Sequence, residues 1–187
     1  MGWKPEIFVV VAYGRILPKT ILDLAPYGCL NVHYSLLPKY RGAAPAAWTI
    51  INGESTTGVT TMKLVEKMDA GPIYLQEATE VASGETTGSL QAKLTPIGAR
   101  LLRETLRRLQ EGLLMPQEQD ESAATFAPIL KRRWAHPMGS ACNDDRTTGA
   151  GLRTLARYLQ SHWRKVIKDS PSERCSQPTR REVQAKS

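Results

Sequence analysis

Residues Glu6 to Tyr13 (EIFVVVAY) form a continuous apolar, largely β-branched run between Pro5 and Gly14. Runs of this kind are typical of parallel strands buried on both faces, because helices cover both sides of a parallel sheet. The run therefore predicts an α/β fold with this strand inside the sheet.

The next segment is expected to complete a compact β-α-β unit. Gly14 provides a flexible turn, and Pro18 suits the first turn of a helix. A short apolar stripe ends before Pro26 and consists of Ile16, Leu17, Ile21, Leu22 and Leu24. A β-compatible run from Gly28 to Tyr34 then predicts the second strand.

Three elements are expected after this unit. Residues 45 to 52 predict a short helix with Trp48 and Ile51 facing inward. Thr57 to Glu66 alternate apolar and polar residues, which indicates a strand with one wet face. Ile73 to Val81 are expected to pair with it in antiparallel orientation, because the connection is too short for a crossover.

Leucine spacing predicts a long helix that begins at Thr86 or Thr87 and ends at Gln110. Pro96 interrupts the pattern, and since proline removes a backbone donor and clashes with the preceding turn, we expect a kink or two helices. The expected core face comprises Leu90, Leu94, Ile97, Leu101, Leu102, Leu106 and Leu109. Residues 124 to 131 (ATFAPILK) are expected to pair as a short edge strand.

The net charge of +7 is concentrated at one end of the chain. Residues 1 to 130 hold 12 Lys/Arg and 13 Asp/Glu, net −1, whereas residues 131 to 187 hold 13 and 5, net +8. The second segment is rich in Ser, Thr and Arg, and within it only residues 152 to 166 show a helical stripe. This composition favours disorder.

The cysteine content and the hydropathy of the chain limit the classes of protein to which it can belong. Cys29, Cys142 and Cys175 are odd in number and form no C-x-x-C pair, so neither a disulfide framework nor a zinc site is indicated. No segment approaches the roughly 18 consecutive apolar residues that a membrane span needs, and the N-terminus lacks a signal-peptide pattern. We expect a cytoplasmic protein.

Polar side chains gather where the predicted second strand ends. Asn31 and His33 are two residues apart, so both point to one face of that strand. Ser35 and Pro38 begin a loop directly after them, and in open α/β sheets ligands bind at such strand ends. Asp69 lies beside a second Gly/Pro-containing loop.

An amide, an imidazole and a carboxylate suit the transfer of an acyl-level group. The Asn31 amide can hold a carbonyl oxygen, the His33 imidazole can stabilise an oxyanion, and the Asp69 carboxylate can orient the imidazole or collect an amine proton. No serine or cysteine lies in an obvious nucleophile elbow, which favours direct transfer. Structural roles stay open: a strand histidine in the core, a turn aspartate, and a Ser35 hydroxyl that ties its own loop.

Two long motifs resemble the catalytic core of the folate-dependent formyltransferases, most closely the members that act on methionyl-tRNA. They are NVHYSLLPKYRGAAP at residues 31–45 and GVTTMKLVEKMDAGPI at residues 58–73, and Asp69 follows His33 by 36 positions. VVVAYGRILP and FAPILK are similar as well, so the resemblance covers about residues 4 to 131.

The resemblance implies transfer of a formyl group from 10-formyltetrahydrofolate to the amino group of methionine on initiator tRNA, without a metal. By position, Asn31 would hold the formyl oxygen and His33 would stabilise the tetrahedral oxyanion. Asp69 would keep His33 in its working state and help remove the amine proton. The resemblance implies folate contacts from Ser35, Leu36, Leu37 and Pro38, and pterin contacts from the backbone of Tyr13, Gly14, Arg15 and Ile16.

The chain departs from this family at both ends. Members begin with a further Rossmann-like half, whose strands would lie beside Ile7 to Ala12, and continue after the equivalent of Lys131 with a tRNA-binding β-barrel. We expect an incomplete Rossmann-like formyltransferase domain at residues 1–131, part of a mostly parallel sheet with flanking helices. Residues 132–187 are expected to be a basic, disordered tail, and our hypothesis for it is a shifted reading frame or a gene fragment.

The missing half predicts that Ile7 to Val11 form an unpaired apolar edge, with poor solubility or low activity as the result. Two alternative functions stay open. The same Asn/His/Asp centre serves formyltransferases that act on small amines, namely glycinamide ribonucleotide or an amino sugar. The other alternative is a non-catalytic fragment whose basic tail binds RNA electrostatically, although a solvated tail is the simpler interpretation. Intact members of the family are expected to be monomers.

Overall fold

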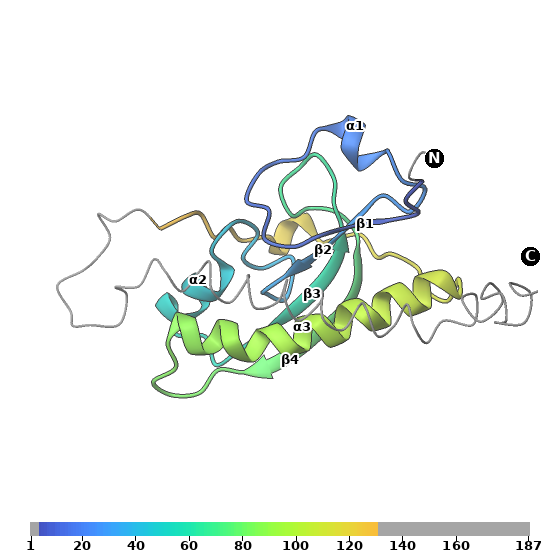
Figure 1. The fold of residues 1–187 in the computed structure, drawn as a ribbon. Coiled ribbons are helices and arrows are strands. Elements are labelled where there is room, and N and C mark those ends of the chain that lie inside the picture. The colour runs from blue at the N-terminus through green and yellow to red at the C-terminus, as the bar shows by residue number, and fades with distance from the viewer. Residues whose placement is uncertain (1–3, 131–187) are drawn as a thin grey trace, which may run out of the picture.

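Four strands build the sheet of the computed structural model, which describes residues 4–130 (Figure 1). The strand order among these residues is β1-β2-β3-β4; β1 and β2 are parallel, and the other two pairings are antiparallel. The elements are β1 (Phe8–Val10), α1 (Lys19–Leu22), β2 (Cys29–His33), α2 (Pro45–Ile51), β3 (Thr56–Lys63), β4 (Ile73–Glu80), α3 (Thr87–Gln110) and the 3-10 turn η1 (Glu121–Ala123). The predicted α/β class is confirmed, with a mixed sheet in the described residues.

The first strand is shorter and more exposed than its apolar run predicts. Only Phe8–Val10 pair with β2, at the edge of the described sheet, and Val9 is 40% exposed. The prediction of a strand buried on both faces from Glu6 to Tyr13 is therefore wrong for residues 4–130. Burial of a parallel strand requires cover from neighbouring elements, and β1 has a strand neighbour on one side within these residues.

The helix after Gly14 is a single turn, α1, with Pro18 as its N-cap. Of the expected apolar stripe only Leu22 is buried, whereas Ile16, Ile21 and Leu24 are exposed. One turn of helix cannot present a stripe of this length to a core. The predicted stripe is thus wrong as a core face.

The helix α2 begins at Pro45, as the sequence predicts. Its buried residues are Ala46, Ala47 and Thr49, whereas Ile51 is exposed. Trp48 is only partly buried, and its indole N–H donates to the Pro128 carbonyl at 2.8 Å. The expectation that Trp48 and Ile51 form the inward face is therefore wrong.

Strand β3 is buried on both faces, so the predicted wet face is wrong. On one face the Thr61 hydroxyl lies 2.8 Å from that of Thr105 in α3. On the other face Thr60 donates to the Ser35 carbonyl at 2.6 Å. The threonines sit in the core because each hydroxyl has a hydrogen-bonding partner there. The predicted antiparallel pairing with β4 is confirmed.

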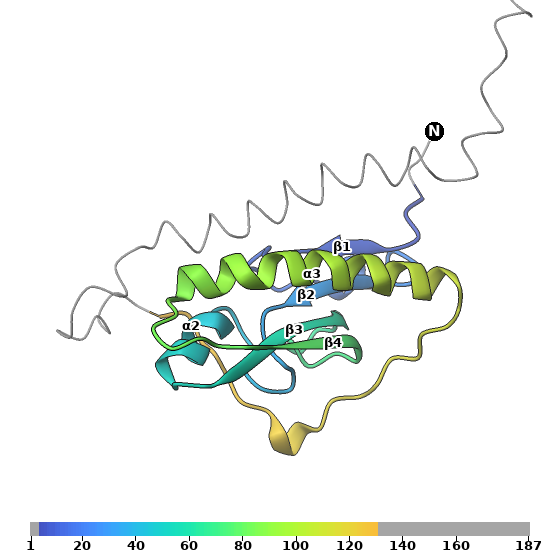
Figure 2. The same cartoon turned by 90° about the horizontal axis from the view of Figure 1, so that it is seen from below.

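The helix α3 runs without a break through Pro96 and covers one face of the sheet (Figure 2). Thr86 is its N-cap, in a capping box with Ser89. The expectation of two helices is wrong, because Pro96 and Ala92, whose carbonyl loses its partner, both lie on the exposed side. The predicted core face is confirmed, with the deepest burial at Leu90, Leu94, Leu101 and Leu102.

After α3 the chain returns over the side of the sheet opposite to α3, and we call residues 113–130 the return segment (Figure 2). Gln117 exchanges two backbone hydrogen bonds with Ile73, and Ala127 accepts from Ala44 and donates to Arg41. Residues 124–130 form one isolated bridge, between Arg41 and Phe126, in place of the expected edge strand. Pro128 cannot donate to a ladder, which limits pairing here.

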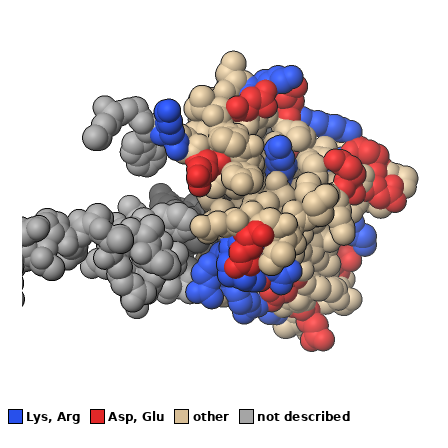
Figure 3. All heavy atoms as spheres, turned by 90° about the vertical axis from the view of Figure 1, so that its right-hand side faces the viewer, with Lys and Arg blue, Asp and Glu red and all other residues tan. Residues whose placement is uncertain are grey.

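Several expectations fall on residues that the structure does not describe. They are Cys142, Cys175, the stripe at 152–166 and the tail 132–187, so the boundary near Lys131 stays a prediction. Among residues 4–130 no helix is long and apolar enough to cross a membrane. On the face shown in Figure 3, basic and acidic side chains are interspersed, in line with the near-neutral balance of residues 1–130.

Candidate functional site

A cavity of about 300 Å³ lies at the end of β2, where the strand passes into a loop. Its walls come from the loop after β1, from β2, from the start of α2 and from the loop between β3 and β4. Asn31, His33 and Asp69 all line it. The three polar residues that the sequence singles out are therefore brought together in one cavity.

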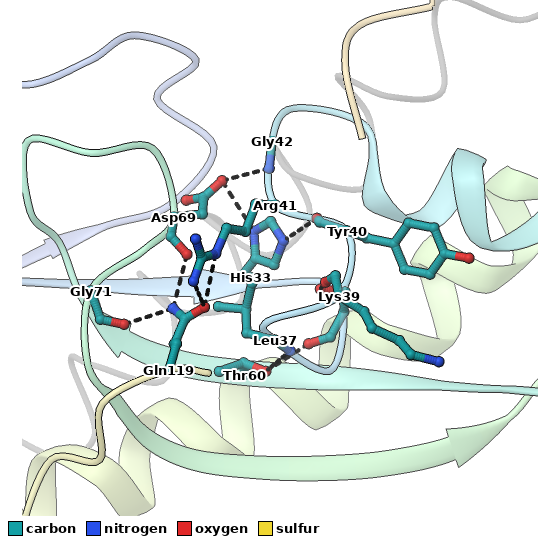
Figure 4. Close-up of polar contacts among 11 residues, drawn as sticks. His33, Leu37, Lys39, Tyr40, Arg41, Gly42, Thr60, Asp69, Gly71 and Gln119 are labelled. Carbon is teal, nitrogen blue, oxygen red and sulfur yellow. Dashed lines mark hydrogen bonds and ion pairs between the residues drawn. The ribbon is translucent and has the colours of Figure 1, made fainter. Parts of the chain in front are cut away.

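His33 lines the cavity with a buried side chain, which is held by Tyr40 and Asp69 (Figure 4). Its Nε2 is 2.8 Å from the Tyr40 carbonyl oxygen, and its Nδ1 is 3.8 Å from Asp69 Oδ2. A carbonyl oxygen only accepts, so Nε2 carries the hydrogen and Nδ1 keeps a lone pair when the ring is neutral.

The pKa of His33 is lowered below its ordinary value of 6.5. Burial is the main cause, and it outweighs the Asp69 charge and the hydrogen bond to Tyr40, which both act to raise the pKa. At neutral pH the imidazole is therefore uncharged, with Nδ1 free to accept a proton.

Tyr40 fixes the orientation of that imidazole. Its backbone has a φ of 62°, in the left-handed region, and its N–H donates to Thr125 Oγ1 at 2.8 Å. The Tyr40 hydroxyl donates to Glu54 at 2.6 Å and accepts from Asn52 at 2.9 Å. Contacts at both ends of this residue thus hold the carbonyl oxygen that accepts the hydrogen bond from His33 Nε2.

Asp69 is held with its carboxylate toward His33 and the loop after β2 (Figure 4). Oδ2 accepts the Gly42 N–H at 2.8 Å, and the backbone φ is 46°. A non-glycine residue in this region costs about 1–3 kcal/mol and persists where surrounding contacts determine it. Its contact with Gly42, 27 positions away, goes beyond a local turn.

The residues expected to contact folate fall into two groups. Tyr13, Gly14, Arg15 and Ile16 line the cavity and are exposed. Ser35, Leu36, Leu37 and Pro38 are not among the residues that line it. Ser35 donates to the Lys39 carbonyl at 2.6 Å, so its hydroxyl ties its own loop, as one interpretation of the sequence held.

Two residues around the site were missed by sequence reasoning. Arg41 belongs to the first motif, yet nothing in its local sequence indicates that its side chain is buried. Gln119 lies in a polar linker without periodicity, and it contacts Arg41 across 78 positions of sequence. No pattern in the sequence around either residue indicates a contact over this separation. Among residues 4–130 no group of three or more His, Cys, Asp and Glu side chains could hold a metal ion.

Comparison with known proteins gives consistent matches. The family described as "Formyl transferase" matches residues 2–106. A methionyl-tRNA formyltransferase of Pelobacter propionicus is 44% identical over 181 residues, which cover 93% of this chain and 56% of that protein. Since the first 131 residues are less than 93% of the chain, this alignment continues beyond Lys131. The chain spans about half the length of the curated relatives it matches.

Solved structures share the fold. Glycinamide ribonucleotide transformylase 1 from Symbiobacterium toebii is 29% identical with a TM-score of 0.54, over 58% of this chain and 53% of that one. HypX from Aquifex aeolicus, in complex with tetrahydrofolic acid, has a TM-score of 0.63 at 21% identity, over 80% of this chain and 25% of that one. At that identity the likeness to HypX concerns the fold alone.

Proposed function

The chain belongs to the formyl transferase family, and from this premise we propose that it transfers a formyl group from 10-formyltetrahydrofolate to the amino group of methionyl initiator tRNA. The observation that carries the proposal is the convergence of Asn31, His33 and Asp69 on one cavity. The acceptor is proposed from the Pelobacter propionicus relative, whose name specifies methionyl-tRNA.

The donor is proposed to enter the cavity with its formyl group toward β2. The Asn31 amide would donate a hydrogen bond to the formyl oxygen. The exposed segment from Tyr13 to Ile16 would contact the pterin ring, and Ser35 to Pro38 would support the folate site through the loop that ends at Gly42. The HypX complex with tetrahydrofolic acid is consistent with such a donor in this fold.

The amine attacks the formyl carbon, which forms a C–N bond and leaves an oxyanion and an ammonium group. His33 Nδ1 accepts the excess proton, directly or through water, since its lone pair is free and its ring is neutral. The resulting imidazolium faces the Asp69 carboxylate, which stabilises it, and the imidazolium stabilises the oxyanion. The bond from the formyl carbon to N10 of the donor then breaks, and N10 receives the proton.

We further propose a cytoplasmic monomer that binds initiator methionyl-tRNA and folate and uses no metal. Residues 1–131 would supply the catalytic part. A small amine is the second candidate acceptor, because the Symbiobacterium toebii glycinamide ribonucleotide transformylase, at 29% identity, has the same fold. An inactive fragment or RNA-binding remnant is the third candidate.

One assay separates these candidates. The 187-residue chain is incubated with 10-formyltetrahydrofolate carrying a labelled formyl group and, separately, with charged initiator tRNA, glycinamide ribonucleotide or a nucleotide amino sugar. Label transfer to the tRNA is expected, and it should be lost in His33→Gln. Transfer only to a small amine would replace the acceptor, and a folded chain that labels none of them would refute the activity.

A further inference from the structure

The side-chain amide of Gln119 uses its full hydrogen-bonding capacity within 3 Å (Figure 4). Its oxygen accepts from Arg41 Nε at 2.9 Å and from Arg41 Nη2 at 2.8 Å. Its nitrogen donates to the Asp69 carbonyl at 2.9 Å and to the Gly71 carbonyl at 2.7 Å. Because an amide has two acceptor positions and two donor hydrogens, this arrangement specifies which end faces Arg41.

These four bonds join two segments that carry the site. Arg41 lies on the loop after β2, whose Gly42 N–H contacts the Asp69 carboxylate. The Asp69 and Gly71 carbonyls belong to the loop before β4. Gln119 therefore fixes the Asp69 loop against the Arg41 loop from the return segment.

We propose that Gln119 is a positioning residue, which holds the left-handed backbone of Asp69 so that its carboxylate faces His33 in the formyl-transfer reaction. The inference rests on the proposed function for its consequence in catalysis. Gln119 lines no part of the cavity, so it acts through Asp69.

The chemistry of the side chain explains why glutamine stands at this position. A glutamate would present a second acceptor to the Asp69 and Gly71 carbonyls, and a methionine would present neither donor nor acceptor. Either change also removes or alters the partner of Arg41, whose guanidinium is buried and retains an ion pair with Glu121 at 3.0 Å. Of these three side chains, only glutamine provides an acceptor for the cation on one side and two donor hydrogens for the carbonyl oxygens on the other.

The charged groups around His33 set the direction of the expected effect. Asp69 is the charged group that pairs with His33. Arg41, on the loop after β2, pairs with Glu121 of the return segment, and Glu121 also pairs with Lys67. The Asp69 charge favours protonation of His33. If the carboxylate moves away, or turns to the guanidinium that has lost Gln119, protonation of His33 becomes less favourable.

The test compares Gln119→Met with Gln117→Met in the full 187-residue chain. Both changes are neutral and lie in the return segment, but the Gln117 side chain is exposed. The His33 pKa is followed by NMR titration of the imidazole resonances, assigned with His33→Gln because the chain has 3 histidines. Formyl transfer is measured in parallel as kcat and KM for the folate donor.

Gln119→Met is expected to lower the His33 pKa and to reduce kcat by about 10²-fold with little change in KM, since small misplacements at a reacting centre have effects of that order. Gln117→Met should change neither quantity. An unchanged His33 pKa in folded Gln119→Met, or an equal shift in Gln117→Met, would overturn the inference. If Gln119→Met does not fold, the shorter Gln119→Asn is titrated in its place under the same criteria.

Measuring both the His33 pKa and formyl transfer distinguishes failure of the positioning role of Gln119 from failure of the proposed function. A wild-type chain without formyl transfer would remove the proposed function. The His33 titration does not depend on turnover, so a lowered pKa confined to the Gln119 variant would still support the positioning role.

Discussion

The buried hydroxyl of Thr60 offers a sharp test of how the site loop is attached to the sheet. Thr60 Oγ1 donates to the Ser35 carbonyl at 2.6 Å and accepts from the Leu37 N–H at 3.2 Å. Gln76 Nε2 also donates to it at 2.9 Å, but keeps a second acceptor in the Leu37 carbonyl. The change Thr60→Val preserves shape and removes these three bonds.

The expected change in the free energy of unfolding follows from the backbone groups that lose a hydrogen-bonding partner in Thr60→Val. Two buried backbone groups, the Ser35 carbonyl and the Leu37 N–H, lose this partner, at about 1–3 kcal/mol each. The added methyl group returns roughly 0.8 kcal/mol of hydrophobic burial. We expect Thr60→Val to lower the free energy of unfolding by about 3 kcal/mol.

The measurement is equilibrium urea unfolding followed by circular dichroism. The midpoint should fall while the m-value stays constant, which identifies a change in stability alone. Thr56→Val is the matched control, because Thr56 lies on the same strand with an exposed side chain and should change stability by less than about 0.5 kcal/mol. A Thr60→Val chain as stable as Thr56→Val would refute the reasoning.

Three further predictions follow from other features. Because burial lowers the pKa of His33 and the ring must be neutral to accept a proton, the acidic limb of the pH–rate profile should lie below pH 6.5, the ordinary value; a limb above that value would contradict this role. Val9→Lys should reduce aggregation in light scattering by placing a charge on the exposed β1 edge, and unchanged scattering would count against that edge as the cause. Thr86→Ala should lower the free energy of unfolding by about 1 kcal/mol through loss of the N-cap of α3, whereas Thr87→Ala, inside the helix, should cost less.

Local patterns were sufficient for some parts of the site. Asn31 and His33 share a strand face because side chains alternate along a strand, and both line the cavity. The leucines of α3 were predictable for the same kind of reason, since helical spacing aligns them on one face. These features depend on neighbours within a few residues.

Features that depend on distant segments were not predictable. Strand β3 has no wet face because α3 covers one of its faces and the Ser35 loop covers the other, and no pattern within β3 reports that cover. Burial of β1 required neighbours that residues 4–130 do not supply. Pro96 predicts a break by its own chemistry, but its exposed position allows the helix to continue.

The return segment has a consequence for the design of shortened versions of this protein. The match to the family described as "Formyl transferase" covers residues 2–106, whereas Gln119 and Thr125 contact the Asp69 and Tyr40 backbones from beyond that range. A truncation chosen from the sequence match would retain Asn31, His33 and Asp69 and lose the contacts that orient two of them. Conversely, adding a peptide that spans residues 113–130 to such a truncated chain would test whether these contacts alone restore the site.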